Sequence, residues 1–192
     1  MNEILKQRLY DQAKRIKDPD IRKFTTTALD NAPAEFWIAP CSSTGKHHPP
    51  EDNVDGGSVI HTLKCLALVP QLAELRSLSE VNTDIAFSAT TLHDIKKNGE
   101  PWGNRTDYTH GLIAYRWLAQ FPLKEPEKEA IRDCVRYHMA KWVEPESEVI
   151  RATHPTKTEE VVQLVDYVCS RDDISFLPGI KLPEDVIKKY LQ

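Results

Sequence analysis

Apolar side chains recur at helical spacing along most of the chain. Ile4, Leu5 and Leu9 show this spacing within residues 3–17, which predicts an amphipathic helix there. Asp18-Pro19 offers a helix N-cap followed by proline at the first helical position, so a second helix is predicted over about 19–31. The same reasoning predicts helices over about 58–75, 82–95, 107–121, 125–142 and 156–171, with a short terminal helix from Pro183. No segment shows the strict alternation of a strand, so we expect an all-α fold.

Residues 32–57 break this periodicity, because prolines and glycines interrupt the segment throughout. Loops of such length inside a compact domain are usually functional or disordered. The loop ends at Gly56-Gly57, and we expect Ser58 to cap the helix that follows. A second loop, with Pro145 and Pro155, is expected before the helix over 156–171.

The composition is that of a soluble globular protein: 192 residues, 40% hydrophobic and 28% charged. No apolar run is long enough to span a bilayer, and the charged N-terminus lacks the apolar segment of a signal peptide. The four cysteines form no C-x-x-C pair, so we expect buried thiols in a reducing compartment. We therefore expect a cytoplasmic protein without membrane association. The net charge of −4 gives no general affinity for polyanions, although a local basic pocket is compatible with it.

Polar side chains interrupt several of the apolar helix faces. Such positions fall at His61, His110, His138 and Asp166, and the pair His93-Asp94 ends a further apolar helix. A buried imidazole or carboxylate costs free energy unless it is paired or bound to metal. Each alone has an ordinary explanation, such as a hydrogen-bonded core histidine or a carboxylate paired with arginine. One shared metal centre would satisfy all of them, and imidazole and carboxylate groups are ordinary ligands of Zn, Mn, Fe and Ni.

The ordered set of these residues resembles the signature of the HD-domain metal-dependent phosphohydrolase superfamily. The stretch from Pro40 to Pro49, followed by Gly56-Gly-Ser-Val-Ile-His-Thr62, is similar to the region before the first ligand in a bacterial subgroup. That subgroup includes the HD domain of 3′-to-5′ exoribonucleases. One departure is Lys96, which stands where the family often has glycine in His-Asp-Ile-Gly-Lys. The resemblance covers roughly residues 40–175 and implies an all-α HD-type domain with the metal site in the helix-bundle core.

We accordingly expect a single domain over residues 1–192. It would consist of N-terminal helices in 1–39, a metal-binding core in 40–175 and a C-terminal extension in 176–192.

The resemblance also implies roles for individual residues. His61, His93 and Asp166 would hold a first divalent ion and His110 and His138 a second, with Asp94 bridging the two ions. One or two ions are expected, from Mn, Fe, Ni, Co or Zn, with Mg possible. A metal pair would polarise a phosphoryl oxygen and lower the pKa of a bound water.

Several further side chains are candidates for catalysis or substrate contact. Lys97 is the candidate for contact with a phosphate oxygen, and it joins Asp94 as a predicted catalytic residue. Ser43, Lys46 and His48 are candidates for substrate binding, because phosphate recognition requires donors near the first ligand. For His48, a place on the loop surface is an equal alternative. Trp102 and Tyr108 could stack on a base, or belong to the core.

These features favour a phosphohydrolase of nucleotides or nucleotide-like phosphoesters, because a compact pocket suits a stand-alone domain with an acidic net charge. A 3′-to-5′ exonuclease is the main alternative. The subgroup resemblance favours it, but the chain has no recognisable oligonucleotide-binding module and no basic, aromatic-rich tract. A non-catalytic metal-binding or regulatory module and a di-iron oxygenase are less favoured. The expected partner is a small nucleotide or an oligonucleotide, and no protein partner is evident in the sequence.

Overall fold

The computed structural model describes residues 3–42, 48–143 and 145–171, and every regular element within them is helical. The α-helices are α1 (Glu3–Ala13), α2 (Pro19–Asp30), α3 (Gly57–Leu75), α4 (Glu80–Leu92), α5 (His110–Leu118), α6 (Glu127–Arg136), α7 (Val149–Ala152) and α8 (Lys157–Cys169). Short 3₁₀ helices are η1 (Ala34–Trp37), η2 (Pro50–Asp52), η3 (Ala140–Trp142) and η4 (Glu146–Glu148). The all-α prediction is confirmed. The predicted helix from Pro183 and the extension over 176–192 lie outside the described residues.

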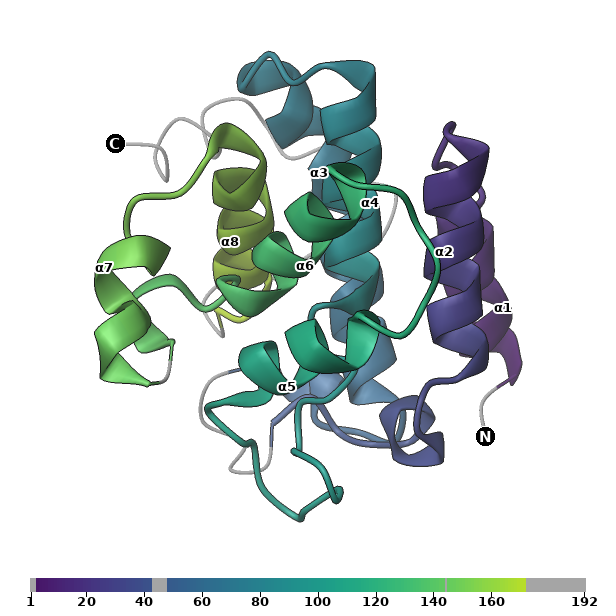
Figure 1. Cartoon of the computed structure of the whole chain (residues 1–192). Helices are drawn as coiled ribbons and strands as arrows, with labels where there is room; N and C mark the ends of the chain where they lie inside the picture. Colours follow the sequence, from purple (N-terminus) through teal and green to yellow (C-terminus); the bar gives the residue numbers. More distant parts are fainter. Residues whose placement is uncertain (1–2, 43–47, 144, 172–192) are drawn as a thin grey trace.

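Helices α3 and α4 form the centre of the bundle (Figure 1). Helix α8 packs against both, α6 packs against α4 and α5, and α1 and α2 cover the opposite side. The core between them is apolar, with Leu66, Leu92, Ile131 and Val165 wholly buried. Each such side chain contributes roughly 1.5–3 kcal/mol through burial. None of the described helices is long and apolar enough to cross a membrane.

The helix starts follow local capping chemistry. The Asp18 carboxylate accepts hydrogen bonds from the first turn of α2, with Pro19 at the first helical position, as the sequence predicts. Ser79 caps α4, which therefore begins earlier than expected. Thr156 and Glu159 form a capping box at the start of α8, the helix that bears Asp166.

Two predicted helix ends are wrong, and one predicted loop contains helices. Helix α1 ends at Ala13 rather than at 17. The backbone N–H groups of Lys17 and Asp18 donate hydrogen bonds to the Asp84 carboxylate, so they do not continue the helical hydrogen bonds of α1. Helix α6 ends at Arg136 rather than at 142, and Ala140 beyond it has a φ of 48°, which an α-helix cannot include. The loop expected around Pro145 and Pro155 contains η4 and α7.

The start of α3 also differs from the prediction. Gly56, with a φ of 79°, is the N-cap, and Ser58 lies inside the helix. A Cβ on Gly57 would lie 1.8 Å from the carbonyl oxygen of Asp52 and 2.8 Å from the backbone nitrogen of Cys41, so only glycine permits this approach. The backbone nitrogen of Cys41 donates to the Asp52 carbonyl at 3.0 Å. The loop is therefore held against the first turn of α3, four residues before His61.

Candidate metal centre

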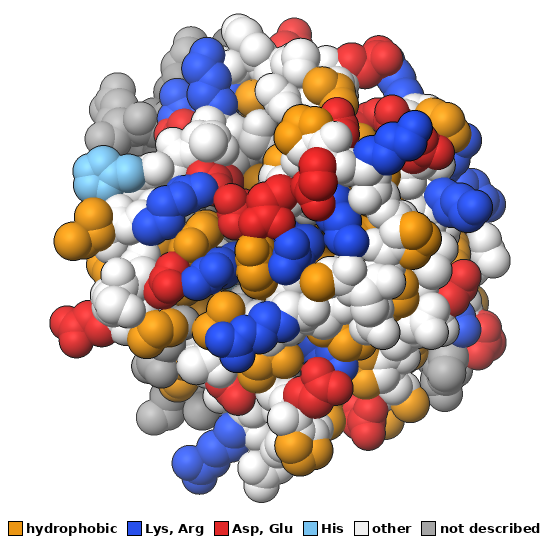
Figure 2. Space-filling view, in the orientation of Figure 1, with side chains coloured by type: hydrophobic (Ala, Val, Ile, Leu, Met, Phe, Trp, Pro, Cys, Tyr) orange, Lys and Arg blue, Asp and Glu red, His pale blue; other side chains and the backbone are white. Residues whose placement is uncertain are grey.

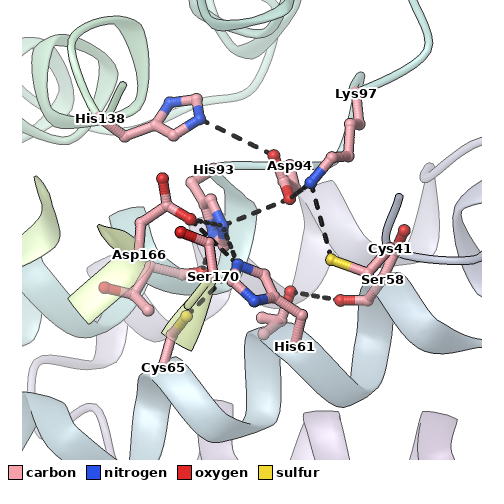
Figure 3. Close-up of polar contacts among 12 residues, drawn as sticks. Cys41, Ser58, His61, Cys65, His93, Asp94, Lys97, His138, Asp166 and Ser170 are labelled. Carbon is pink, nitrogen blue, oxygen red and sulfur yellow. Dashed lines mark hydrogen bonds and ion pairs between the residues drawn. The ribbon is translucent and has the colours of Figure 1, made fainter. Parts of the chain in front are cut away.

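Six side chains predicted to bind metal converge from five places in the fold. They are His61 on α3, His93 and Asp94 directly after α4, His110 at the start of α5, His138 shortly after α6, and Asp166 on α8. All except Asp166 are almost wholly buried, whereas 19% of the Asp166 side chain is exposed. Figure 3 shows five of these side chains pointing toward one another. The convergence that the sequence predicts is therefore present, and access from solvent is greatest beside α8.

The first group of ligand atoms joins α3, α4 and α8. His61 Nε2 lies 3.0 Å from Asp166 Oδ1 and 3.4 Å from His93 Nε2. His93 Nε2 lies 3.7 Å from Asp166 Oδ1 and 3.5 Å from Asp94 Oδ2. The Cys65 sulfur also belongs to this group, 3.5 Å from His61 Nε2. Two imidazoles and two carboxylates at this spacing can ligate one divalent ion.

The second group lies on the other side of Asp94. His110 Nε2 and His138 Nε2 are 3.0 Å apart, and they lie 3.2 and 3.7 Å from Asp94 Oδ1. Asp94 thus turns Oδ2 toward His93 and Oδ1 toward His110 and His138. A carboxylate with one oxygen facing each histidine group is placed to bridge two ions.

The hydrogen bonds of three histidines direct their lone pairs into the centre. The Nδ1 atoms of His93, His110 and His138 lie 2.7, 2.6 and 2.6 Å from the backbone carbonyls three residues earlier. Since a carbonyl can only accept, each Nδ1 carries the proton and each Nε2 is left with a lone pair. The Nε2 atoms of His110 and His138 lie 3.0 Å apart, close enough for both to ligate one cation. This donor set therefore fits a metal ion.

Burial and nearby charges set the protonation states that such an ion needs. Burial lowers the pKa of His93, and burial together with neighbouring His110 lowers the pKa of His138 to about 3. Burial alone would raise the pKa of Asp94, but Lys97, His93 and His110 hold it well below its ordinary value. In Asp166, burial alone would raise the pKa, but the hydrogen bond from His61 together with the nearby His93 and His138 outweighs burial and lowers it. Neutral imidazoles beside ionised carboxylates are competent ligands at neutral pH.

His61 behaves differently in the absence of metal. Burial lowers its pKa, but Cys41 and Asp166 outweigh that effect and raise the pKa well above its ordinary value. His61 is then protonated against Asp166, and a metal ion would take the place of this proton.

A family model described as HD domain matches residues 59–171, more than half of the 192 residues. The chain belongs to the HD-domain family. The family consists mostly of metal-dependent hydrolases that bind divalent metals, and the matched range includes all six predicted ligands. No curated protein and no solved structure matches the chain. The superfamily prediction is confirmed, whereas the likeness to the exoribonuclease subgroup stays a prediction.

Lys97 of the HD domain is buried against the bridging carboxylate. Its ammonium donates to Asp94 Oδ2 at 2.6 Å and to the Cys41 sulfur at 3.7 Å. Lys96, which replaces the family glycine, lies over the Trp117 ring at 4.9 Å and pairs with Glu100. The pairing of Lys97 with Asp94 neutralises charge at the centre, and its contact with a phosphate stays a prediction.

Of the predicted substrate-binding residues in the long loop, Ser43 and Lys46 lie outside the described residues. His48 is buried, so the alternative of a loop-surface histidine is wrong. Its Nδ1 lies 3.1 Å from the Cys41 sulfur, and its ring packs edge-on against His61 with centroids 4.8 Å apart. Its contact with substrate stays a prediction.

Sequence reasoning missed two thiols beside the HD centre, Cys41 and Cys65. Cys65 lies one helical turn after His61 on α3, so its spacing could have revealed it. Cys41 lies in the irregular loop, where no periodicity predicts the direction of a side chain. All four cysteines of the chain are buried free thiols, as expected.

Proposed function

We propose that this HD domain is a metal-dependent phosphohydrolase that acts on nucleotides. The observation that carries the proposal is the bridging position of Asp94, with one oxygen toward each histidine group. His61, His93 and Asp166 would hold one ion with Asp94, and His110 and His138 the other. Bound divalent ions supply Lewis acidity toward a phosphoryl oxygen and lower the pKa of a bound water.

The residues around the ions would orient the substrate. The partial exposure of Asp166 favours approach of the phosphoester and water from the α8 side. Lys97 has three N–H donors, of which Asp94 and Cys41 engage two. No hydrogen bond of the third donor is found among the described residues; from that position the ammonium would donate to a phosphate oxygen and stabilise charge that develops in the transition state.

A pocket beside the centre supports a nucleotide as substrate. It has a volume of about 270 Å³ and is lined by Glu35, Ile38, Ala39, Pro40, Asn98, Trp102, Gly103 and Asn104. Pro40 precedes Cys41 and Asn98 follows Lys97, so two lining residues of the pocket are next in sequence to the two residues of the contact between Cys41 and Lys97. An aromatic ring with amide and carboxylate groups nearby can stack on a nucleobase and bind its edges.

Phosphate release from a panel of nucleotides, measured with Mn²⁺ and beside p-nitrophenyl phosphate, tests this proposal. Trp102→Leu and Glu35→Gln should raise KM for nucleotides but not for p-nitrophenyl phosphate, which has no base. Trp142→Leu is the matched control, because Trp142 is exposed and stacks on Tyr167 outside the pocket. Shortening of a labelled single strand without phosphate release from mononucleotides would overturn the small-nucleotide proposal in favour of an exonuclease. A metal-loaded protein inactive on every phosphoester would indicate a non-catalytic module.

A further inference from the structure

Beside the two groups of the HD centre lies a further cluster of atoms that could ligate a metal. Cys41, His48 and His61 each offer one ligand atom, and these atoms lie within 4.8 Å of one another. All three side chains are at least nine-tenths buried. Figure 3 shows the Cys41 sulfur turned toward Lys97, on the same side of the centre as Asp94. The cluster draws on the loop before α3 as well as on α3 itself, so it extends the site beyond the helices that carry the HD ligands.

The two histidines of this cluster have nitrogen atoms available for a ligand. The ring of His48 is buried, and its Nδ1 lies 3.1 Å from the Cys41 sulfur, so this nitrogen faces the cluster. His61 directs Nε2 toward Asp166, and its Nδ1 is buried with no hydrogen-bond partner among the described residues. A buried polar nitrogen without a partner destabilises the folded state. A cation bound at this place would remove that cost.

We propose that Cys41, His48 and His61 form a third cation position, beside the two positions of the HD centre. A thiolate with two imidazoles is a borderline-soft ligand set, which favours Zn²⁺, Co²⁺ or Fe²⁺ over Mg²⁺ and Mn²⁺. Binding would break the S–H bond of Cys41 and the Nδ1–H bond of the protonated His61, form sulfur–metal and nitrogen–metal bonds and release two protons, with no change of oxidation state. When the HD centre is filled as well, His61 would also lose its Nε2 proton, so that each of its two nitrogens could serve one site. The Lys97 ammonium then donates to the metal-bound sulfur.

Cobalt spectroscopy tests this assignment without any measurement of hydrolysis. Metal-free full-length protein is titrated with Co²⁺ while near-ultraviolet absorption is recorded and bound cobalt is counted by elemental analysis. A thiolate ligand produces a sulfur-to-cobalt charge-transfer band, which nitrogen and oxygen ligands do not produce. The wild type should show this band, and Cys41→Ser and His48→Gln should each lose it together with one equivalent of bound cobalt. Circular dichroism shows whether each variant is folded.

Two other thiols provide matched controls. Cys134→Ser changes a buried thiol on α6, and Cys65→Ser changes the thiol 3.5 Å from His61 Nε2 on the HD side. Both variants should keep the band. If Cys65→Ser abolishes it while Cys41→Ser keeps it, or if cobalt-loaded wild type shows no band, the third position is refuted. For a variant that fails to fold with Co²⁺, X-ray absorption on the zinc-loaded Cys65→Ser protein decides, because a zinc–sulfur distance of about 2.3 Å requires a thiolate and Cys65 is then absent. Absence of such a scatterer would refute the proposal and leave the phosphohydrolase proposal standing.

Discussion

The Asp94→Asn variant removes one negative charge from the centre with almost no change of shape. In the metal-free protein, Asp94 and Lys97 form a buried ion pair with 2.6 Å between Oδ2 and Nζ. Asparagine leaves the Lys97 ammonium buried without the carboxylate that it pairs with. Loss of one partner of a buried pair costs about 3–5 kcal/mol, and we expect a destabilisation of that size. Urea unfolding in the presence of a chelator measures it.

A second substitution shows whether the cost arises from the stranded charge. Lys97→Met removes the ammonium and keeps an apolar side chain of similar length. The double variant Asp94→Asn/Lys97→Met should recover most of the lost stability, because replacing a whole buried pair by neutral groups is often close to neutral. A loss below about 1 kcal/mol for Asp94→Asn, or a double variant no more stable than the single one, would refute the buried-pair reasoning.

The double variant also separates folding from chemistry. It should be stable yet lose at least ~10³-fold in kcat/KM, because several kcal/mol of charge stabilisation by the bridged ions would be lost and about 1.4 kcal/mol corresponds to tenfold in rate. Asp133→Asn is the control, since that carboxylate lies 3.7 Å from Arg151 and outside the centre. Full activity in the double variant would contradict the role of Asp94.

Three further predictions address other parts of the account. His110→Ala or His138→Ala should reduce bound Mn²⁺ from two ions to one per chain by elemental analysis, and loss of both ions would contradict two separable positions. The metal-free protein should lose stability as pH falls from 6.5 toward about 3, because the unfolded chain protonates His138 over that range while the folded protein keeps it neutral. His138→Gln should flatten this slope in urea unfolding, and an unchanged slope would contradict it. Gly57→Ala should destabilise by about 1–3 kcal/mol or more, because its Cβ would meet backbone. Gly103→Ala, with its nearest neighbour at 3.3 Å, should cost less in thermal unfolding, and equal costs would refute the steric argument.

The helices and most of the centre could be predicted from the sequence because their signals are local. A polar residue within an apolar stripe, such as His138 or Asp166, must face the interior when the stripe does. Asp18-Pro19 fixed the start of α2 for the same local reason. The identity and order of the ligands also follow the HD signature, so the family resemblance and the periodicity agree.

The errors arose where distant contacts determine the local structure. The end of α1 depends on Asp84, which is far along the chain and accepts two backbone N–H groups. Cys41 and His48 lie in an irregular loop, and their burial depends on the close approach of that loop to Gly57. Neither spacing nor composition contains this information. The positions of Cys41 and His48 beside the HD centre could therefore be found only from the structure.

A crystal structure of the Mn²⁺-loaded protein with anomalous scattering tests the central claim most directly, because Mn²⁺ disfavours thiolate and reports on the HD ligands alone. The account predicts two anomalous peaks, one among His61, His93 and Asp166 and one between His110 and His138. The Asp94 carboxylate should lie between the two peaks and contact both. Absence of density at these places, or ions bound elsewhere with Asp94 free of metal, would contradict it.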